Sequence, residues 1–462
     1  QMCIRDRVQS VLAARIDRLP ERQKQLLQVA SVIGKDFAEP LLAEVAEEPA
    51  EELKTALGAL RDAEFIHEQS IFPVTEYSFK HPLTQEVALG SQLRERRRTV
   101  HSAVARAIEH QHAEHLEERA PLLAHHYEEA GEALPAARWH RRAAEWVGTT
   151  DVAAAMHHWK RLRVMLRDLP SDRETAELGI AACRQLLNMG WRVGMDDAES
   201  RRILAEGHAL ADSLGDRRAH AEQSILHGRA LCAQGDVAAY VQAAIEYQQA
   251  ALELDHGPTL ANAWGFRTDS LGFAARFGES LAVADEAIER FPRDIAPEHW
   301  IIGISPASWY SIWRGFALTW TGRLTEAAEE LGRCRRLAEE DGTLEMVGYA
   351  HSFLCETHYH AREPDRLLAS ARQVEDISER LGEHPVMVAH AQTAVALAHI
   401  AGGRAADAIE PARTAFDILG TVEKQHAGRS AWVLAEALLG SGDHAGALAA
   451  AEEAIALCSR SL

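Results

Sequence analysis

The chain has no long apolar run, no excess of positive charge and no paired cysteines. In 462 residues no apolar run approaches the roughly 20 residues that span a bilayer, so we predict no membrane segment. Lys and Arg number 49 against 69 Asp and Glu, a formal net charge of -20, which argues against nonspecific binding to nucleic acid or to an acidic membrane. The six cysteines form no CxxC motif, which favours free thiols in a reducing cytosol, so we predict a cytoplasmic protein.

A catalytic or metal-binding pattern is also missing. No Ser-His-Asp or Cys-His arrangement can be argued, because no nucleophile stands in a strained turn or near a plausible base. Among the 24 histidines, Cys355-x-x-His358-x-His360 is a nominal metal-ligand set. His358 and His360 would point to different sides of a helix, however, and would not converge with Cys355. We therefore predict that this chain is not an enzyme and binds no metal or cofactor of its own.

What the chain has is a spaced pattern of small residues. Gly131 is preceded by Ala124 at seven positions and followed by Ala136 and Ala143 at five and twelve positions. Two helices approach closely only where their crossing positions lack bulk, and the turn between them favours glycine. The pattern predicts helical hairpins and resembles the tetratricopeptide repeat. The same spacing returns around three further glycines: Gly322, Gly403 and Gly442.

Weaker copies fill the gaps between these repeats. The predicted turns lie at positions 235, 278, 322, 363, 403 and 442, which are 39 to 44 residues apart. The copy at Gly278 is shortened, and the copy near Arg362 has no glycine. This spacing exceeds the usual 34-residue unit, so the sequence predicts extended, irregular repeats.

The N-terminal region has a different pattern, in which helices precede two strands. Phe65–Ser70 and Val74–Lys80 are predicted strands, and a long helix is predicted over Leu83–His115. Helices before a hairpin are the order of a winged helix, but the candidate recognition helix is acidic, so we predict no binding to nucleic acid. The predicted helices are Val8–Leu19, Glu21–Ile33, Phe37–Ala46 and Ala50–Ala63.

The predicted fold class is therefore all-α, in two domains. Residues 8–98 are expected to form a winged-helix-like domain with one short β-hairpin, and residues 99–462 an irregular tetratricopeptide-type α-solenoid. Residues 1–7 begin with Gln1 and continue no later pattern, and we interpret them as a non-native scar. We suspect that the sequence is a fragment at its N-terminal end. Because no polar capping helix follows the last repeat, the C-terminal end is suspected of being incomplete as well.

Four segments carry a family resemblance: Leu12–Pro20, Ala30–Gly34, Tyr77–Ala88 and Leu123–Tyr127. They resemble the region after the nucleotide-binding core in bacterial signal-transduction ATPases with numerous domains. Within that group they are most similar to chains with a class III adenylate/guanylate cyclase domain, an AAA-type ATPase module and tetratricopeptide repeats. The resemblance covers about residues 8–150 and is generic beyond them.

The resemblance implies a regulatory arm whose own upstream ATPase domain binds ATP or ADP with Mg²⁺. The family's phosphate loop is absent here, because the one Gly-Lys pair, Gly34-Lys35, precedes Asp36 and lacks the upstream glycine. The resemblance also implies that His81, at the end of the hairpin, senses the ADP β-phosphate. The alternative is that His81 only caps or packs the joint between strand and helix.

A dense group of aromatic residues is the candidate partner-binding surface. It lies beside the predicted inter-repeat loop Arg293–Pro306 and would anchor a protein or peptide partner on the concave face. The alternative is that these rings fill space beside the long loop. Two other functions remain open, a stand-alone repeat adaptor and a fragment of a repeat-containing transcription regulator. The group is Trp300, Trp309, Tyr310, Trp313 and Trp320.

Overall fold

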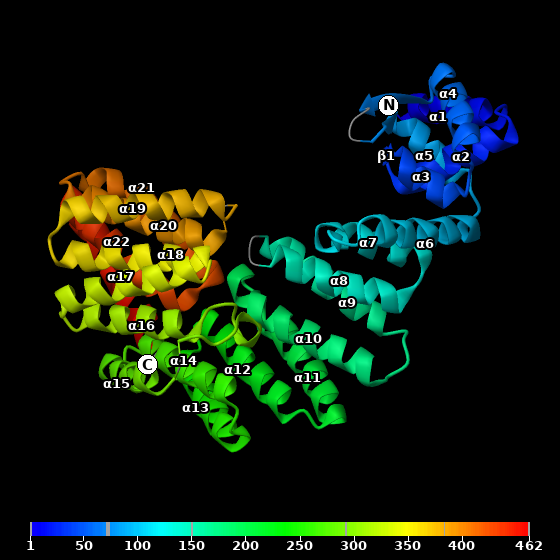
Figure 1. The fold of residues 1–462 in the computed structure, drawn as a ribbon. Coiled ribbons are helices and arrows are strands. Elements are labelled where there is room, and N and C mark those ends of the chain that lie inside the picture. Colours follow the sequence, from blue (N-terminus) through cyan, green and yellow to red (C-terminus); the bar gives the residue numbers. More distant parts are fainter. Residues whose placement is uncertain (1, 71–73, 149–150, 292, 383, 461–462) are drawn as a thin grey trace. The chain divides into compact units, whose positions relative to one another are not determined.

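The computed structural model describes residues 2–70, 74–148, 151–291, 293–382 and 384–460, and helices dominate this part of the chain (Figure 1). The chain divides into two units, one of residues 1–148 with 157–178 and one of residues 149–156 with 179–462. The predicted domain boundary between residues 98 and 99 falls inside the first unit and stays a prediction. Residue 1 of the predicted scar lies outside the described residues, as do residues 71–73 between the predicted strands.

The first unit begins with helices around a small antiparallel sheet. Its strand order is β1-β3-β2, and Tyr77 of the central strand pairs with Phe37 on one side and Glu68 on the other. The elements are α1 (Met2–Asp17), α2 (Glu21–Ile33), β1 (Asp36–Ala38), α3 (Glu39–Ala46), α4 (Ala50–Asp62), β2 (Ile66–Ser70) and β3 (Glu76–Phe79).

The first strand corrects the predicted helix Phe37–Ala46. Phe37 lies in β1, and α3 begins only at Glu39. The Phe37 ring is buried, with its centroid 5.9 Å from that of Tyr77 and 5.8 Å from that of Phe79. This pairing joins residues about forty positions apart, so the local pattern does not reveal it, and the expected hairpin is one part of a three-stranded sheet.

The long helix predicted over Leu83–His115 is also wrong as a single element. It is divided into α5 (Pro82–Gly90) and α6 (Arg94–Gln111). Ser91 ends α5 by donating its hydroxyl to the Ala88 carbonyl at 2.7 Å. The buried side chain of Gln92 donates to the Gln28 carbonyl of α2 at 3.0 Å. A tertiary contact therefore interrupts the helix where the local sequence pattern predicts that it continues.

The first hairpin of the repeat pattern joins α7 (Leu116–Ala130) to α8 (Ala133–Val147). Gly131 turns between them at φ 75°, and the three small residues of the predicted crossing are fully buried. Arg98 donates to the Ala130 carbonyl at 2.8 Å, which satisfies one of the free carbonyls at the end of α7. The following helices are α9 (Val152–Leu166) and α10 (Arg173–Gly190).

The second unit continues as helices that pack on their neighbours in sequence order, coloured green to red in Figure 1. Gly322, Gly403 and Gly442 have φ of 80°, 73° and 91°, so the predicted helical-repeat array is confirmed. The elements are η1 (Trp191–Val193), α11 (Asp197–Leu214), α12 (Arg217–Ala233), α13 (Val237–Leu254), α14 (Gly257–Phe273), α15 (Phe277–Arg290), η2 (Pro297–His299), α16 (Pro306–Trp320), α17 (Leu324–Glu340), α18 (Leu344–His360), α19 (Pro364–Arg380), α20 (Pro385–Ala401), α21 (Ala405–Val422), α22 (Lys424–Ser441) and α23 (His444–Arg460).

Two turns of the array use residues other than glycine. The turn predicted at Gly278 lies instead at Ala275, which has φ 54°, and Gly278 is inside α15. In the repeat that lacks a glycine, Arg362 takes the left-handed conformation at φ 57°. Each such residue costs on the order of 1–2 kcal/mol. The packing of the flanking helices therefore imposes the turn where the local sequence disfavours it.

Helices near the start and near the end of the second unit contact each other. η1 contacts α20 and α21, and α12 contacts α22. Two ion pairs join these distant segments: Arg192 Nη2 lies 3.0 Å from Glu345 Oε2, and Arg229 Nη2 lies 2.8 Å from Glu423 Oε1. All four side chains are largely buried, so polar contacts inside the protein hold early and late repeats together. Among the described helices, none has the length and apolar character to cross a bilayer.

Candidate functional site

The candidate site is a cavity inside the second unit, with a free volume of about 60 Å³. Because a buried water needs roughly 10–15 Å³ of such space, the cavity holds about four waters or a small group. Its wall is mainly aromatic and comes from η1, α12, α14, α16, α18, the segment before α16 and the start of α22. The aromatic residues of the wall are Trp191, Phe266, Phe273, Trp309, Trp313, Tyr349 and Phe353.

Arg229 of α12 brings a cation to this aromatic wall. Its guanidinium carbon lies 4.3 Å from the ring centroid of Trp191 and 4.9 Å from that of Phe273. Burial lowers the pKa of Arg229, but the charges of Glu423 and Asp269 outweigh burial and raise this pKa. Within the described part of the chain, Arg229 Nη1 has no hydrogen-bond partner. The cavity wall thus keeps one cationic donor unused.

Asp269 of α14 is a buried acid in the same wall. Burial raises the pKa of its carboxyl group to about 7, although the charge of Arg229 and a hydrogen bond from Tyr240 act in the opposite direction. Tyr240 donates to Asp269 Oδ2 at 2.8 Å, while Asp269 Oδ1 has no hydrogen-bond partner among the described residues. Burial therefore favours the protonated form of Asp269 more than in an exposed aspartate.

A second buried charge pair lies next to the cavity. Arg429 of α22 lies 3.0 Å from Glu356 of α18, both side chains being almost fully buried. Burial raises the pKa of Glu356, although the charge of Arg429 lowers it. Arg429 Nη2 also lies 3.1 Å from His390 Nδ1, which in turn is 2.7 Å from the Ser352 hydroxyl. The interior of the array thus contains a polar network in place of a purely apolar core.

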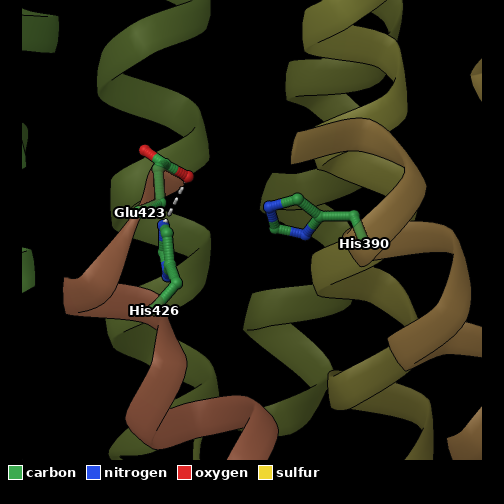
Figure 2. Close-up of side chains that lie close together, drawn as sticks. All are labelled: His390, Glu423 and His426. Carbon is green, nitrogen blue, oxygen red and sulfur yellow. Dashed lines mark ion pairs between the residues drawn. The ribbon is translucent and has the colours of Figure 1, made fainter. Parts of the chain in front are cut away.

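Three potential ligand side chains converge in this network (Figure 2). His390 projects from α20 toward Glu423, the N-cap residue of α22, and His426, in the first turn of α22. One nitrogen or oxygen from each lies within 4.8 Å of the others, and all three residues are buried. The pKa values of His390 and His426 are well below the usual 6.5, because of burial first and then the charge of Arg429. Both rings are therefore neutral at pH 7.

The structure separates the five aromatic residues of the predicted binding surface. Trp309 and Trp313 line the cavity, and their rings occupy the space that a side chain at Gly265 or Gly272 would fill. Tyr310 is buried and donates to a backbone carbonyl of α14 at 2.6 Å.

The other two aromatic residues do not line the cavity. Trp300 donates its indole N–H to the Ile295 carbonyl at 2.8 Å. Trp320 is 37% exposed and packs its ring against His360 and Trp432, with centroids 5.5 and 5.8 Å away. Only Trp309 and Trp313 of the predicted set therefore meet in the cavity wall.

His81 lies at the N-terminus of α5, and the residue is exposed. Its Nδ1 accepts a hydrogen bond from the Leu83 backbone N–H at 3.1 Å, so the neutral ring carries its proton on Nε2. This contact is the capping role that the sequence leaves open beside nucleotide sensing. The Nε2–H is the group with which the ring can donate to an anion.

Sequence reasoning missed Arg229, Asp269 and Glu423. Each lies in or beside a helix that also carries other polar residues, so a charged residue there is a weak signal of a buried polar site. The spacing Glu423-x-x-His426 offers a further signal, because two polar side chains three residues apart lie near each other at a helix start. Nothing local points to the partners of these residues, which lie up to 194 positions away.

Comparisons with known proteins find only remote structural similarity. No family model and no curated protein matches the sequence. A signal transduction ATPase with numerous domains and a tetratricopeptide repeat sensor from Pyrococcus horikoshii is 12% identical, with a TM-score of 0.46 over 96% of this chain. This chain spans 63% of the length of that ATPase.

Two further solved structures are similar at the same level. A Rap protein complexed with competence and sporulation factor is 12% identical, with a TM-score of 0.49 over 71% of this chain and 87% of that one. The APC/C hetero-tetramer Cut9–Hcn1 is 10% identical, with a TM-score of 0.35 over 82% of this chain and 78% of that one. At these scores the function has to be argued from the site itself.

Proposed function

We propose that this chain is a non-catalytic regulatory arm that senses a protein, peptide or small ligand through the interior of its second unit. The observation that carries the proposal is the cavity beside Arg229, which combines aromatic walls with buried charges whose hydrogen-bonding capacity is incompletely used. A core built for stability alone gains little from buried ion pairs, because desolvation offsets most of their attraction. Concave aromatic sites with a few polar groups are typical of ligand pockets.

Ligand binding in the cavity would affect the contacts that hold early and late repeats of the second unit together. The ion pairs Arg192–Glu345 and Arg229–Glu423 join early to late repeats, and Glu423 also lines the cavity. A group inserted between Trp309 and Trp313 would compete with these pairs and favour a more open array. A ligand shifts such an equilibrium only by its difference in affinity for the two states. The polar network supplies that difference.

We further propose that the first unit connects this sensor to an upstream ATPase domain through a winged helix. The β2–β3 hairpin after α4, joined by β1 into a three-stranded sheet, and the exposed His81 at a helix N-terminus support this role, since helix N-termini favour phosphate groups. ATP or ADP with Mg²⁺ would bind upstream, and a cyclase would be the output domain. A stand-alone repeat adaptor, or a piece of a transcription regulator, is the alternative and would need no nucleotide.

The first test is the genomic sequence in frame before codon 8. A phosphate loop within a few hundred codons supports the ATPase arm, whereas a stop codon and promoter there would contradict it and leave the adaptor. With the loop present, ATP turnover of the complete protein is measured for wild type, for a deletion of residues 179–462 and for His81→Ala. We expect the deletion to change turnover and His81→Ala to weaken ADP binding.

A cavity-filling variant tests the sensing site. Ile304→Phe adds a ring to the cavity wall, and Leu368→Phe is the matched control at an exposed position of α19. We expect Ile304→Phe to hold the array closed and to change turnover in the same assay, while Leu368→Phe leaves turnover unchanged. Equal turnover in wild type, in both variants and in the deletion would refute the regulatory proposal.

A further inference from the structure

We propose that His390, Glu423 and His426 form a binding site for one zinc ion or a similar first-row divalent cation. The site is distinct from the Cys355-x-x-His358-x-His360 motif and does not depend on the proposed sensing function. Two imidazoles and one carboxylate are a donor set that Zn²⁺ accepts, with the fourth position left to water or to a ligand. The exposed fractions of the three residues are 0%, 1% and 6%, so all three are shielded from bulk solvent.

Two of the three residues of this site have a donor atom that is not used elsewhere in the described part of the chain. Among the described residues, His390 Nε2 and Glu423 Oε2 have no hydrogen-bond partner. His426 Nε2 lies 3.9 Å from Glu423 Oε2, which is too long for a hydrogen bond. Figure 2 shows the His390 ring directed at the other two side chains. Buried polar atoms without partners are rare in folded proteins, and an ion at their common centre would satisfy them.

Small side-chain movements would complete the geometry. The donor atoms lie within 4.8 Å of one another, whereas ligands of a tetrahedral zinc site lie roughly 3.4 Å apart at bond lengths near 2.1 Å. Side-chain rotations that move the donor atoms by about 1 Å would bring them to this separation. His390 and His426 come from α20 and α22, which already pack beside each other.

The surrounding charges favour a cation over an anion. Three carboxylates, Asp269, Glu356 and Glu423, face two guanidiniums, Arg229 and Arg429. When all five are ionised the group carries one surplus negative charge, and the nearby Arg192–Glu345 pair is balanced. Burial raises the pKa values of Asp269 and Glu356, so this surplus grows as the pH rises. Because the two histidines are neutral, they do not repel a cation. An anionic ligand would increase the surplus, whereas a divalent cation reverses it to a single positive charge.

Neighbouring residues would orient the ligands. Arg229 holds Glu423 Oε1 at 2.8 Å, which leaves Oε2 for the metal. For His390 Nε2 to bind an ion, its Nδ1 must carry the proton and donate to the Ser352 hydroxyl, 2.7 Å away. Metal-bound histidines generally donate their second nitrogen in this way. Arg429 Nη2, which lies 3.1 Å from His390 Nδ1, would lose this hydrogen bond, while Arg429 would retain its ion pair with Glu356.

The competing explanation is a water molecule in the cavity. In that case Arg429 donates to His390 Nδ1, the proton sits on Nε2, and water bridges Nε2–H to Glu423 Oε2. The cavity is large enough for such a water, and Glu423 and His426 line it. The two explanations differ in whether the purified chain takes up a stoichiometric metal ion, which makes the proposal testable without knowledge of any partner.

The experiment is titration of the EDTA-treated chain with ZnCl₂ by calorimetry, with metal content measured by mass spectrometry after dialysis. Co²⁺ replaces Zn²⁺ in a second titration, because its visible absorption reports the coordination geometry. We expect one tight equivalent per chain, and at least a 100-fold loss of zinc affinity in His390→Asn and in His426→Asn. Asparagine keeps a polar atom near the Nδ1 position and removes Nε2.

Two controls separate lost ligation from lost folding. His351→Asn alters another largely buried histidine of the second unit and should leave the tight equivalent intact. Glu423→Gln keeps an acceptor for Arg229 and should lose zinc affinity while retaining the far-ultraviolet circular dichroism of wild type. The proposal is overturned if folded wild type takes up no zinc, or if the His390→Asn/His426→Asn double variant retains the same tight equivalent. If the only sites in wild type are weak ones that the double variant shares, the binding is adventitious, and this result would also overturn the proposal.

Discussion

Removal of the Arg229 charge should destabilise the second unit strongly. Arg229→Met keeps most of the side-chain volume but leaves Glu423 and Asp269 without their cation. At 2.8 Å and an effective dielectric constant of about 20, the attraction between Arg229 and Glu423 is about 6 kcal/mol before desolvation is counted. Truncating one member of a buried pair typically costs about 3–5 kcal/mol, because the remaining charge stays desolvated. We expect a loss of stability in that range.

A second substitution should recover most of this loss. Glu423→Leu in the Arg229→Met background removes the orphaned carboxylate, and replacing both members of a buried pair by apolar groups is often close to neutral. The unfolding midpoint in urea, followed by tryptophan fluorescence, is the measurement, since Trp309 and Trp313 lie in the same cavity wall. The reasoning is refuted if Arg229→Met costs less than about 1 kcal/mol, or if the double variant is no more stable than the single one.

The same variant should show a characteristic dependence on pH. Burial already raises the pKa of Asp269 to about 7 in the presence of Arg229, and without the guanidinium this pKa rises further. A carboxyl group with a raised pKa in the folded state destabilises it increasingly as pH increases above the unfolded value near 3.9. The stability difference between wild type and Arg229→Met should therefore shrink as pH falls from 8 to 5. A constant difference would contradict the assignment of Asp269.

Three further predictions concern stability. Burial lowers the pKa values of His101 and His126, which contact each other, to about 4 and 3. The protein should therefore lose stability as pH falls from 6.5 toward 4, by about 3 kcal/mol for His101 alone. Melting curves that show no such loss across this range would contradict the prediction. Gly272→Ala should lower the free energy of unfolding, measured in urea, by about 1–3 kcal/mol, because the new methyl group would lie 2.4 Å from the Trp313 ring. The control Gly332→Ala, whose methyl group would have only one distant side-chain contact, should be neutral or stabilising. Arg362→Gly should raise the melting temperature by relieving about 1 kcal/mol of left-handed strain, and a lower melting temperature would show that the arginine side chain outweighs it.

The sequence by itself determined the repeat array and most of its register. The small residues around Gly131, Gly322 and Gly403 act over one helical hairpin, so a local spacing contains the whole physical cause. The predictions of no nucleic-acid binding and no membrane segment likewise rest on composition alone, namely on the excess of acidic residues and the lack of apolar runs.

Tertiary structure decided the features that depend on residues distant in the chain. Phe37 forms a strand because Tyr77 lies beside it, and the predicted helix across Ser91 is broken because Gln92 reaches α2. The site depends on tertiary structure even more, since Arg229 and Glu423 meet across 194 residues. Their pairing results from the accumulated rotation of many repeats. No local pattern encodes that rotation, and a charged residue on a helix does not reveal its distant partner.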